Sequence, residues 1–578
     1  MRVTDAPPFP WSAPRRSWLT TPTLLMAGAG LVVGFLTLLP LFFLVYGSFF
    51  TPTVGGQAGT FTLANFAKAY ADRSALPILL NSIAFAAGTL VVAVVVGTAL
   101  AWITERTNAP LRGAFFAMSL IPLIIPGILF TVSWIFLLSP RIGLINVWLQ
   151  DLFGLASAPF NVYSLPGMMW VEGLHWSPIV YLLMSAAFRS MDPALEESAL
   201  MSGASLRSTF YHITLPLNLP TLLSVVLLLF LRGLETFEVP AIIGLPAGIQ
   251  VFTSKIYLAI RSYPSDFGLA GAYSTILLGL TSIGIYIYAR VTREASRFAT
   301  VTGKGFRPRV IDLGPWRYLA TALIVLYLTV MVALPVFVLL WNSLLPFYLK
   351  PSLQALQRLT FENYPFVFKL PKTTRAILNS LVLSFASATI IMLLTSVVAW
   401  IVVRTRLRGR WVLDNLASLP LIFPSVVMGV ALIWVYLTLP IPIYGTIWIL
   451  LVAYVTRFLP YGMRACSAGL VQIHRELEEA AETSGAPWRQ SFTGIVLPLL
   501  RPALLAGWIY IVIVSIRELG SSIFLWGPGA EVLSVIIFDF WQTGHFQELC
   551  AVGIMLILLL FVLALVSRRL SQRYGVQH

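Results

Sequence analysis

The sequence has few charged residues and almost no cysteine. Asp, Glu, Lys and Arg make up 11% of the 578 residues, whereas a soluble domain has roughly 25%. The two cysteines, Cys466 and Cys550, lie in apolar stretches and are expected to be small buried residues. The composition therefore excludes an ordinary soluble domain, and the cysteines exclude a disulfide framework or a cysteine-rich metal site.

Motifs for nucleotide binding and hydrolysis are also missing. The sequence contains no G-x-x-x-x-G-K-[ST], so this chain is not expected to hold the phosphates of ATP itself. It has no H-E-x-x-H, no paired catalytic carboxylates and no G-x-S-x-G elbow. We therefore expect a protein that is not an enzyme and that binds no cofactor of its own.

Apolar residues are what the sequence has in abundance, at 58% of the chain. They form runs of about 20 residues, which is the length needed to cross a bilayer as a helix. Lipid offers no hydrogen-bond partner to free backbone groups, and the runs are continuous rather than alternating, so an all-α polytopic membrane protein is predicted and a β-barrel is not. About twelve spans are expected, near residues 23–47, 78–103, 114–138, 166–188, 217–240, 269–290, 318–342, 376–403, 412–438, 444–470, 503–525 and 549–567.

The distribution of basic residues predicts the orientation. If both termini are inside, 25 of the 38 Lys and Arg residues fall in inside segments and 10 in outside loops. Positive charge is enriched on the cytoplasmic side of membrane proteins. Both termini are therefore expected in the cytoplasm, and the net charge of +15 needs no nucleic-acid partner.

The chain also contains an internal repeat. Residues 80–107 match residues 378–405 at an offset of 298, and later segments match at an offset of 282. A repeat of six spans places both halves in the membrane in the same orientation, so two parallel six-helix repeats related by a pseudo-two-fold axis are expected. The predicted organisation is an N-terminal cytoplasmic segment (1–22), a flanking span with an outside loop (23–76), a first repeat (77–290), a cytoplasmic linker (291–317), a second flanking span with its loop (318–374), a second repeat (375–568) and a cytoplasmic tail (569–578).

One polar stretch occurs in each half. "EESALMSGASLRSTFYHITLPLNLP" (Glu196–Pro220) returns as "EEAAETSGAPWRQSFTGIVLPLLRP" (Glu478–Pro502), with 13 of 25 positions identical. In the first copy Asp192 and Pro193 suit a helix start, and Gly203 suits a turn with positive φ. We expect a short helix, a glycine turn and a second helix on the cytoplasmic face of each half. A plain interfacial connector is the alternative, but it gives no reason for the fixed spacing in both copies.

The spacing in both copies resembles the EAA loop, E-A-A-x3-G-x9-I-x-L-P, of the membrane subunits of type I ABC importers. Only Ser198, in place of Ala, departs from it. The resemblance implies a bacterial inner-membrane permease with a coupling helix in each half, which docks on two copies of a separate ATPase that uses ATP and Mg. It also implies a periplasmic substrate-binding protein as a partner, besides the lipid bilayer. The positions to which it assigns coupling are Glu196, Glu197, Ser198, Ala199, Gly203, Arg207, Glu478, Glu479, Ala480, Ala481, Gly485 and Arg489.

A second set of charges lies in the predicted fifth span of each half. It comprises Arg232, Glu235 and Glu238 in the first half and Arg517 and Glu518 in the second. Charges in a membrane are costly and usually face a partner or an aqueous path. They are interpreted either as the lining of the translocation path or its gate, or as ion pairs that hold the bundle together. His175 is expected to be packed or interfacial rather than a ligand.

The substrate is less well indicated than the class of protein. The fused twelve-span form looks like the ferric-iron importer permeases, which take Fe(III) from a periplasmic binding protein, and the oxygens of Glu235 and Glu238 suit a hard cation. No metal-ligand set can be assigned. Similar permeases carry thiamine, polyamines, phosphonates or sulfate-like anions. A secondary transporter driven by an ion gradient is the alternative class, because it also uses parallel repeats, but it does not account for two EAA loops.

Overall fold

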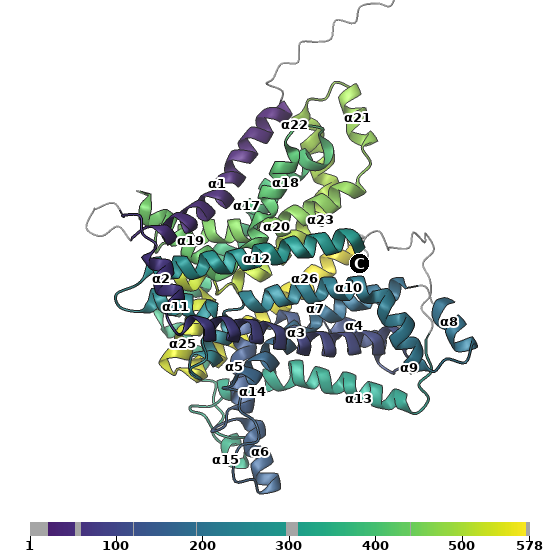
Figure 1. Cartoon of the computed structure of the whole chain (residues 1–578), viewed down its shortest axis with the longest axis vertical. Helices are drawn as coiled ribbons and strands as arrows, with labels where there is room; N and C mark the ends of the chain where they lie inside the picture. The colour runs from purple at the N-terminus through teal and green to yellow at the C-terminus, as the bar shows by residue number, and fades with distance from the viewer. Residues whose placement is uncertain are drawn as a thin grey trace, which may run out of the picture.

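The computed structural model describes residues 21–51, 59–119, 121–191, 194–295, 310–439 and 441–573. Within these residues every regular element is a helix, and the only other pairings are two isolated β-bridges (Figure 1). Residues 1–20 of the predicted N-terminal segment, most of the linker and the last residues of the predicted tail lie outside the described residues. The prediction of an all-α protein is confirmed.

The first half consists of five long helices, one bent pair and several short helices. The long helices are α1 (Thr21–Phe49), α3 (Ala75–Arg106), α7 (Leu165–Ser190), α10 (Leu215–Glu235) and α12 (Phe267–Ala295). The bent pair is α4 (Arg112–Met118) with η1 (Ile121–Ile124), followed by α5 (Gly127–Leu138). The short helices are α2 (Ala64–Tyr70), α6 (Leu144–Phe153), α8 (Ala194–Met201), α9 (Leu206–Thr209), η2 (Phe210–Thr214), η3 (Pro240–Gly244) and α11 (Phe252–Arg261).

The second half repeats this order. Its long helices are α13 (Trp316–Leu328), continued by η5 (Thr329–Ala333) and α14 (Leu334–Ser343), then α17 (Pro371–Arg404), α20 (Ile447–Gln472), α23 (Leu497–Ile516) and α26 (Phe546–Arg573). Its bent pair is α18 (Arg410–Ser418) with η6 (Leu419–Ile422), followed by α19 (Ser425–Thr438). The short helices are α15 (Leu353–Leu356), α16 (Asn363–Lys369), α21 (Glu476–Thr483), α22 (Trp488–Ser491), η7 (Phe492–Val496), α24 (Ser522–Leu525) and α25 (Leu533–Thr543).

The number of spans follows from length and composition. Among the described residues, eight helices are long and apolar enough to cross a membrane, or up to ten if each bent pair is one span. The helix at the fourth predicted span of each half, α7 or α20, has 26 residues but does not reach the same hydropathy. Both helices instead pack closely against the second span of their own half, α3 and α17. The polytopic fold in two halves is confirmed, although the twelve predicted spans are not equally apolar.

The third predicted span of each half is not a straight helix. The two parts of the pair meet at 95° in the first half and at 109° in the second. Pro126 and Pro424 stand at the break, each immediately before the second helix and with an extended backbone. Proline lacks the amide donor and clashes with the preceding turn, so it ends or kinks a helix. The predicted continuous spans at 114–138 and 412–438 are thereby corrected.

The fifth span ends earlier than predicted. α10 stops at Glu235 and α23 at Ile516. Glu238, Arg517 and Glu518 therefore lie just beyond these helices and not within them. In the first half the backbone leaves the helical conformation at Thr236, which has φ −61° and ψ 133°.

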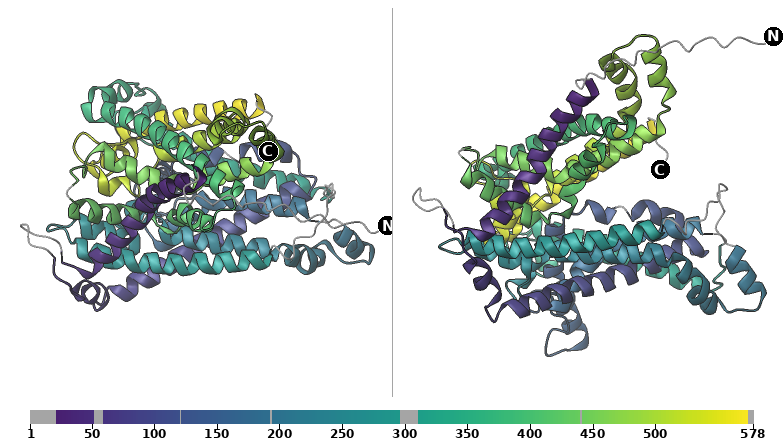
Figure 2. Two further views of the ribbon diagram at one scale, coloured as in Figure 1. Left: turned by 90° about the horizontal axis from the view of Figure 1, so that it is seen from above. Right: turned by 45° about the horizontal axis from the view of Figure 1, so that its top comes forward.

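The flanking helices cross over to the opposite half. α1 packs against α17, α18 and α19 of the second half as well as against α12, and α14 packs against α5 of the first half as well as against α26. In Figure 1 α1 follows the arm that contains α17 and α18, whereas α13 follows the arm that contains α3 and α4. The first helix of each half thus packs against helices of the other half. The arms diverge toward the end that carries α8 and α21 and meet at the end that carries α11 and α25 (Figures 1 and 2).

Candidate functional site

Each half carries the same polar segment at the diverging end of the molecule. In the first half it runs from α8 through α9 and η2 into α10, and in the second from α21 through α22 and η7 into α23. Gly203 has φ +85° and Gly485 has φ +82°, a conformation that a side chain with a Cβ rarely adopts. The expected helix, glycine turn and second helix are present in both halves. Asp192 and Pro193, the predicted helix start, lie outside the described residues.

Most of the residues that the EAA pattern singled out are on the surface. The exposed ones are Glu197, Ser198, Gly203, Glu479, Ala480, Gly485 and Arg489, while Ala199 and Ala481 are half-buried. The side chain of Arg207 is outside the described residues. Each segment therefore presents a surface of small residues and a few charges, which a partner protein could approach closely.

The first glutamate of the first segment turns away from that surface. Glu196 is only 5% exposed. Its Oε2 lies 3.4 Å from Nη1 of Arg106, at the end of α3, and its Oε1 accepts a hydrogen bond of 2.5 Å from the Thr214 hydroxyl. Arg106 is completely buried, and its three guanidinium nitrogens have no hydrogen-bond partner among the described residues. Glu196 thus ties the polar segment to the second span.

The second segment repeats this anchor with different bonds. Oε1 of Glu478 lies 2.8 Å from Nε of Arg404, and its Oε2 accepts a hydrogen bond of 2.8 Å from the Trp400 indole. Arg404 also donates to the carbonyl oxygens of Leu470 and Ile473, at 2.9 and 2.6 Å. Sequence reasoning assigned Glu196 and Glu478 to docking and did not find this anchor. The available signal was the equivalent pair of arginines, which recurs at the repeat offset of 298.

The chain between the halves is hydrogen-bonded to the backbone at the first anchor. The Ile311 amide donates to the Arg106 carbonyl at 2.8 Å, and the Asn108 amide donates to the Ile311 carbonyl at 3.1 Å. The Asn108 side chain binds Asp312 and the amide of Leu313. Hydrogen bonds from the Gly314 amide and from Asn108 lower the pKa of the exposed Asp312 carboxyl below its usual value. We call residues 310–313 together with residues 106–108 the linker clip.

A polar cavity of about 390 Å³ lies between the two halves, near the ends of α10 and α23. All five charges predicted for a translocation path line it. Arg232 and Glu235 come from the last turn of α10, and the other three lie beyond the ends of α10 and α23. Sequence reasoning did not include several further polar residues of the lining, which are Glu172, His175, Trp176, Thr236, Arg457, Tyr461 and Tyr510.

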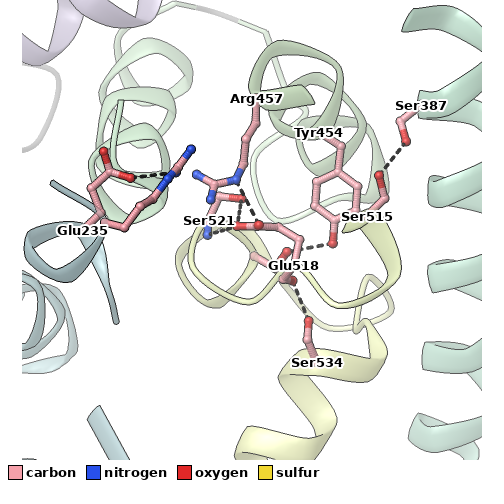
Figure 3. A network of polar contacts seen from close by, with 10 residues as sticks. Glu235, Ser387, Tyr454, Arg457, Ser515, Glu518, Ser521 and Ser534 are labelled. Carbon is pink, nitrogen blue, oxygen red and sulfur yellow. Dashed lines mark hydrogen bonds and ion pairs between the residues drawn. The ribbon is translucent and has the colours of Figure 1, made fainter. Parts of the chain in front are cut away.

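Two ion pairs hold most of these charges. Arg232 bonds Glu235 at 3.0 Å within the first half, and Arg457 lies 3.0 Å from Glu518 within the second. Figure 3 shows Arg457 pointing at Glu518, whose Oε1 also accepts from the amide and hydroxyl of Ser521 at 3.0 and 3.1 Å. These charges are therefore already satisfied by protein groups.

Two further charges are bonded to neutral groups. Glu172 accepts a hydrogen bond of 2.7 Å from the Trp176 indole and one of 2.6 Å from the Thr236 hydroxyl. Arg517 donates to the carbonyl of Leu123 at 2.6 Å, and this bond joins the second half to the first. Glu172 is 4% exposed, so its hydrogen bonds compensate for the loss of water.

The two walls of the cavity differ in charge. At the repeat offset of 282, Glu235 corresponds to Arg517 and His175 corresponds to Arg457. The first half contributes three glutamates and one arginine to the lining, and the second half two arginines and one glutamate. With His175 neutral, the cavity has a formal net charge of −1.

Aromatic side chains join the halves at the end where the arms meet. Phe237 and Tyr257 of the first half contact Phe524 and Phe538 of the second, with ring centroids 5.9–6.1 Å apart. All four are at most 5% exposed. Gln542 adds a hydrogen bond of 3.1 Å to the Tyr257 hydroxyl across the same boundary. The cavity is therefore bordered by a packed apolar contact at this end.

The described residues contain no group of three or more His, Cys, Asp and Glu side chains placed to hold a metal ion. Glu235, one of the two predicted oxygen ligands, is engaged by Arg232. The cavity is thus not built as a chelating metal centre.

Comparison with known families defines the class of protein. Residues 93–294 and 397–575 match the family of binding-protein-dependent transport system inner membrane components. The two matched regions cover more than half of the chain and fall one in each half, so the chain belongs to this family, the permeases of ABC importers.

Individual relatives are similar along most of the chain. It is 27% identical over 94% of its length to the ferric transport system permease protein FbpB of Actinobacillus pleuropneumoniae, of which 78% is covered. It is 28% identical over 78% of its length to the putative ferric transport system permease protein FbpB 1 of Haemophilus influenzae, of which 70% is covered. Among solved structures, a bacterial ABC transporter that imports alginate has 20% identity and a TM-score of 0.38, with 47% of this chain and 95% of that chain covered.

Proposed function

We propose that this chain is the permease of an ATP-driven importer for ferric iron, which a periplasmic binding protein delivers. Two copies of a separate ATPase drive transport, and each docks on one of the two polar segments. The observation that carries this proposal is the pair of equivalent exposed segments at one end of the molecule, each with a glycine turn and a buried glutamate anchor. Two equivalent polar segments suit a partner with two-fold symmetry. In this proposal ATP and Mg are bound by that partner.

The proposed orientation places both polar segments and both termini in the cytoplasm. It is supported by the excess of Lys and Arg on that side. The polar cavity then lies about 30 Å farther from the cytoplasm, because the 21 residues of α10 rise about 1.5 Å each. The arms diverge toward the cytoplasm, and the contact of Phe237, Tyr257, Phe524 and Phe538 closes the outer side.

Iron is favoured over other substrates by the relatives whose names specify ferric transport and whose similarity extends along both halves. The net charge of the cavity also favours a cation over an anion. A permease for spermidine and putrescine and one for 2-aminoethylphosphonate match 36% and 41% of this chain, which is 81% and 84% of their own length, so each corresponds to less than half of this chain.

The direct test uses the permease purified with its ATPase and reconstituted in liposomes. Binding protein loaded with Fe(III) is expected to stimulate ATP hydrolysis and ⁵⁵Fe uptake, and the empty binding protein is the control. Stimulation by a binding protein loaded with spermidine or 2-aminoethylphosphonate, and not by the ferric one, would contradict the iron assignment. Uptake that persists without ATP and stops when an ion gradient is dissipated would instead identify a secondary transporter.

A further inference from the structure

One carboxylate in the polar cavity is left without a partner. Of the four glutamates, Glu235 and Glu518 are in ion pairs and Glu172 accepts two hydrogen bonds. Glu238 has neither an ion pair nor a hydrogen bond to any described residue, although Arg517 and Arg457 lie in the same lining. The other three glutamates of the cavity are thus bonded to protein groups, whereas the Glu238 carboxylate is available to a ligand.

The position of Glu238 depends on the absence of a side chain at Gly127. A Cβ on Gly127, at the start of α5, would lie 1.9 Å from Oε2 of Glu238 and 3.5 Å from Nε2 of His175. Only glycine at this place leaves room for the carboxylate beside the imidazole. His175 itself has a buried Nδ1 without a hydrogen-bond partner among the described residues.

The second half has the reverse arrangement. At the repeat offsets Glu238 corresponds to Gly520, and Gly127 corresponds to Ser425. A Cβ on Gly520 would lie 2.0 Å from the Ser425 hydroxyl oxygen, so here the glycine makes room for the serine. The same small space is occupied by a carboxylate in one half and by a hydroxyl in the other. The uncommitted charge is therefore a specific feature of the first half and not a consequence of the repeated fold.

We propose that Glu238, beside His175, is the transient binding site for a cationic substrate as it crosses the polar cavity. This inference rests on the proposed import function and names the residue that the cation contacts. A single carboxylate and one imidazole do not chelate a metal, and a path must release what it binds. A hard cation such as Fe(III) prefers oxygen ligands, and in this site it keeps most of its other ligands as water or a small anion.

The first test measures cation binding in the purified full-length chain. Terbium(III), a hard trivalent cation, is titrated while its emission is sensitised by Trp176, which lines the cavity. Glu238→Gln is expected to weaken the sensitised binding about tenfold or more. The matched control is Glu531→Gln, which also removes one carboxylate but from outside the cavity, where Glu531 lies 3.8 Å from Arg375. Equal emission from Glu238→Gln and Glu531→Gln, or no sensitised emission from the wild-type chain, would overturn the proposal.

Two more variants separate charge from position. Glu238→Asp keeps the charge on a shorter side chain and should retain part of the binding. Gly127→Ala keeps the carboxylate but displaces it, and it should weaken terbium binding about as much as Glu238→Gln. Full binding by both Gly127→Ala and Glu238→Gln would show that the cation is held elsewhere.

The reconstituted importer then distinguishes this inference from the proposed substrate. Glu238→Gln should slow ⁵⁵Fe uptake about tenfold, while Fe-loaded binding protein still stimulates ATP hydrolysis. Unchanged iron uptake by this variant would overturn the role of Glu238 and leave the iron assignment intact. Terbium binding that depends on Glu238, in a complex that ferric-binding protein does not stimulate, would support the cation site and remove iron as the substrate.

Discussion

Glu196 and Glu478 occupy equivalent places in the two halves, yet their arginine partners are bonded differently. Arg404 contacts Glu478 and donates to two backbone carbonyls, whereas the guanidinium of Arg106 has a single ion pair within the described part of the chain, with Glu196 at 3.4 Å. The backbone carbonyl of Arg106 also accepts a hydrogen bond from the linker clip, through the Ile311 amide at 2.8 Å. The two halves therefore share the buried pair of a glutamate and an arginine but differ in the other bonds of the arginine.

The largest difference between the halves is expected when each anchor arginine is removed. Arg404→Met removes the ion pair to the buried Glu478, which keeps its bond from Trp400, and the two hydrogen bonds to the Leu470 and Ile473 carbonyls. Losing these bonds costs about 3–5 kcal/mol of folding free energy. Arg106→Met should cost about 1–3 kcal/mol, because Glu196 keeps its bond from Thr214 and the lost guanidinium had no hydrogen bond to described groups. Thermal unfolding of the two purified variants in detergent measures both costs. Equal losses would mean that the two anchors are equivalent.

The glycine turns should behave alike, since both have positive φ. Gly203→Ala and Gly485→Ala each force a Cβ into that conformation, at about 1–2 kcal/mol. Each variant should therefore retain less of the ATPase when the complex is purified. Gly494→Ala is the control, because its Cβ would meet nothing within 4 Å and its φ is not positive. Normal ATPase retention by a double variant at 203 and 485 would refute the docking role.

The linker clip can be opened by Asn108→Ala. This change removes two side-chain hydrogen bonds, to Asp312 and Leu313, and should lower stability by about 1 kcal/mol. Arg406 stands at the equivalent position of the second half and is exposed, so Arg406→Ala should have almost no effect on thermal unfolding. A larger loss from Arg406→Ala than from Asn108→Ala would contradict the asymmetry.

The smallest expected effect is a pH dependence of the stability that Asp312 contributes in the linker clip. The pKa of Asp312 is lowered in the folded protein, so its contribution is present above the pKa of the unfolded chain and is lost as the pH falls through the lower folded value. Asp312→Asn should consequently be slightly less stable than the wild type at neutral pH. The difference between the two thermal midpoints should shrink below about pH 4, and a difference that grows in acid would contradict this assignment.

Particular residues show why the sequence predicted some features and not others. The helix, glycine turn and helix of each polar segment were predictable, because Gly203, Gly485 and the neighbouring small residues act locally. The breaks at Pro126 and Pro424 were visible in the sequence as recurring prolines but were placed inside straight spans. The early ends of α10 and α23 were missed as well, since continuous hydropathy does not distinguish a helix from an apolar loop packed inside protein.

The sequence by itself determined the helical membrane fold, its duplication and the two polar segments, because hydropathy, proline and glycine positions and repeated spacing are properties of short stretches of chain. Only the tertiary structure decided which charges meet. It paired Arg232 with Glu235 and Arg457 with Glu518, directed Glu196 and Glu478 inward, and left Glu238 open to the cavity. Such contacts depend on how distant helices and both halves pack, and the free energy of a buried charge is set by the neighbours that this packing supplies.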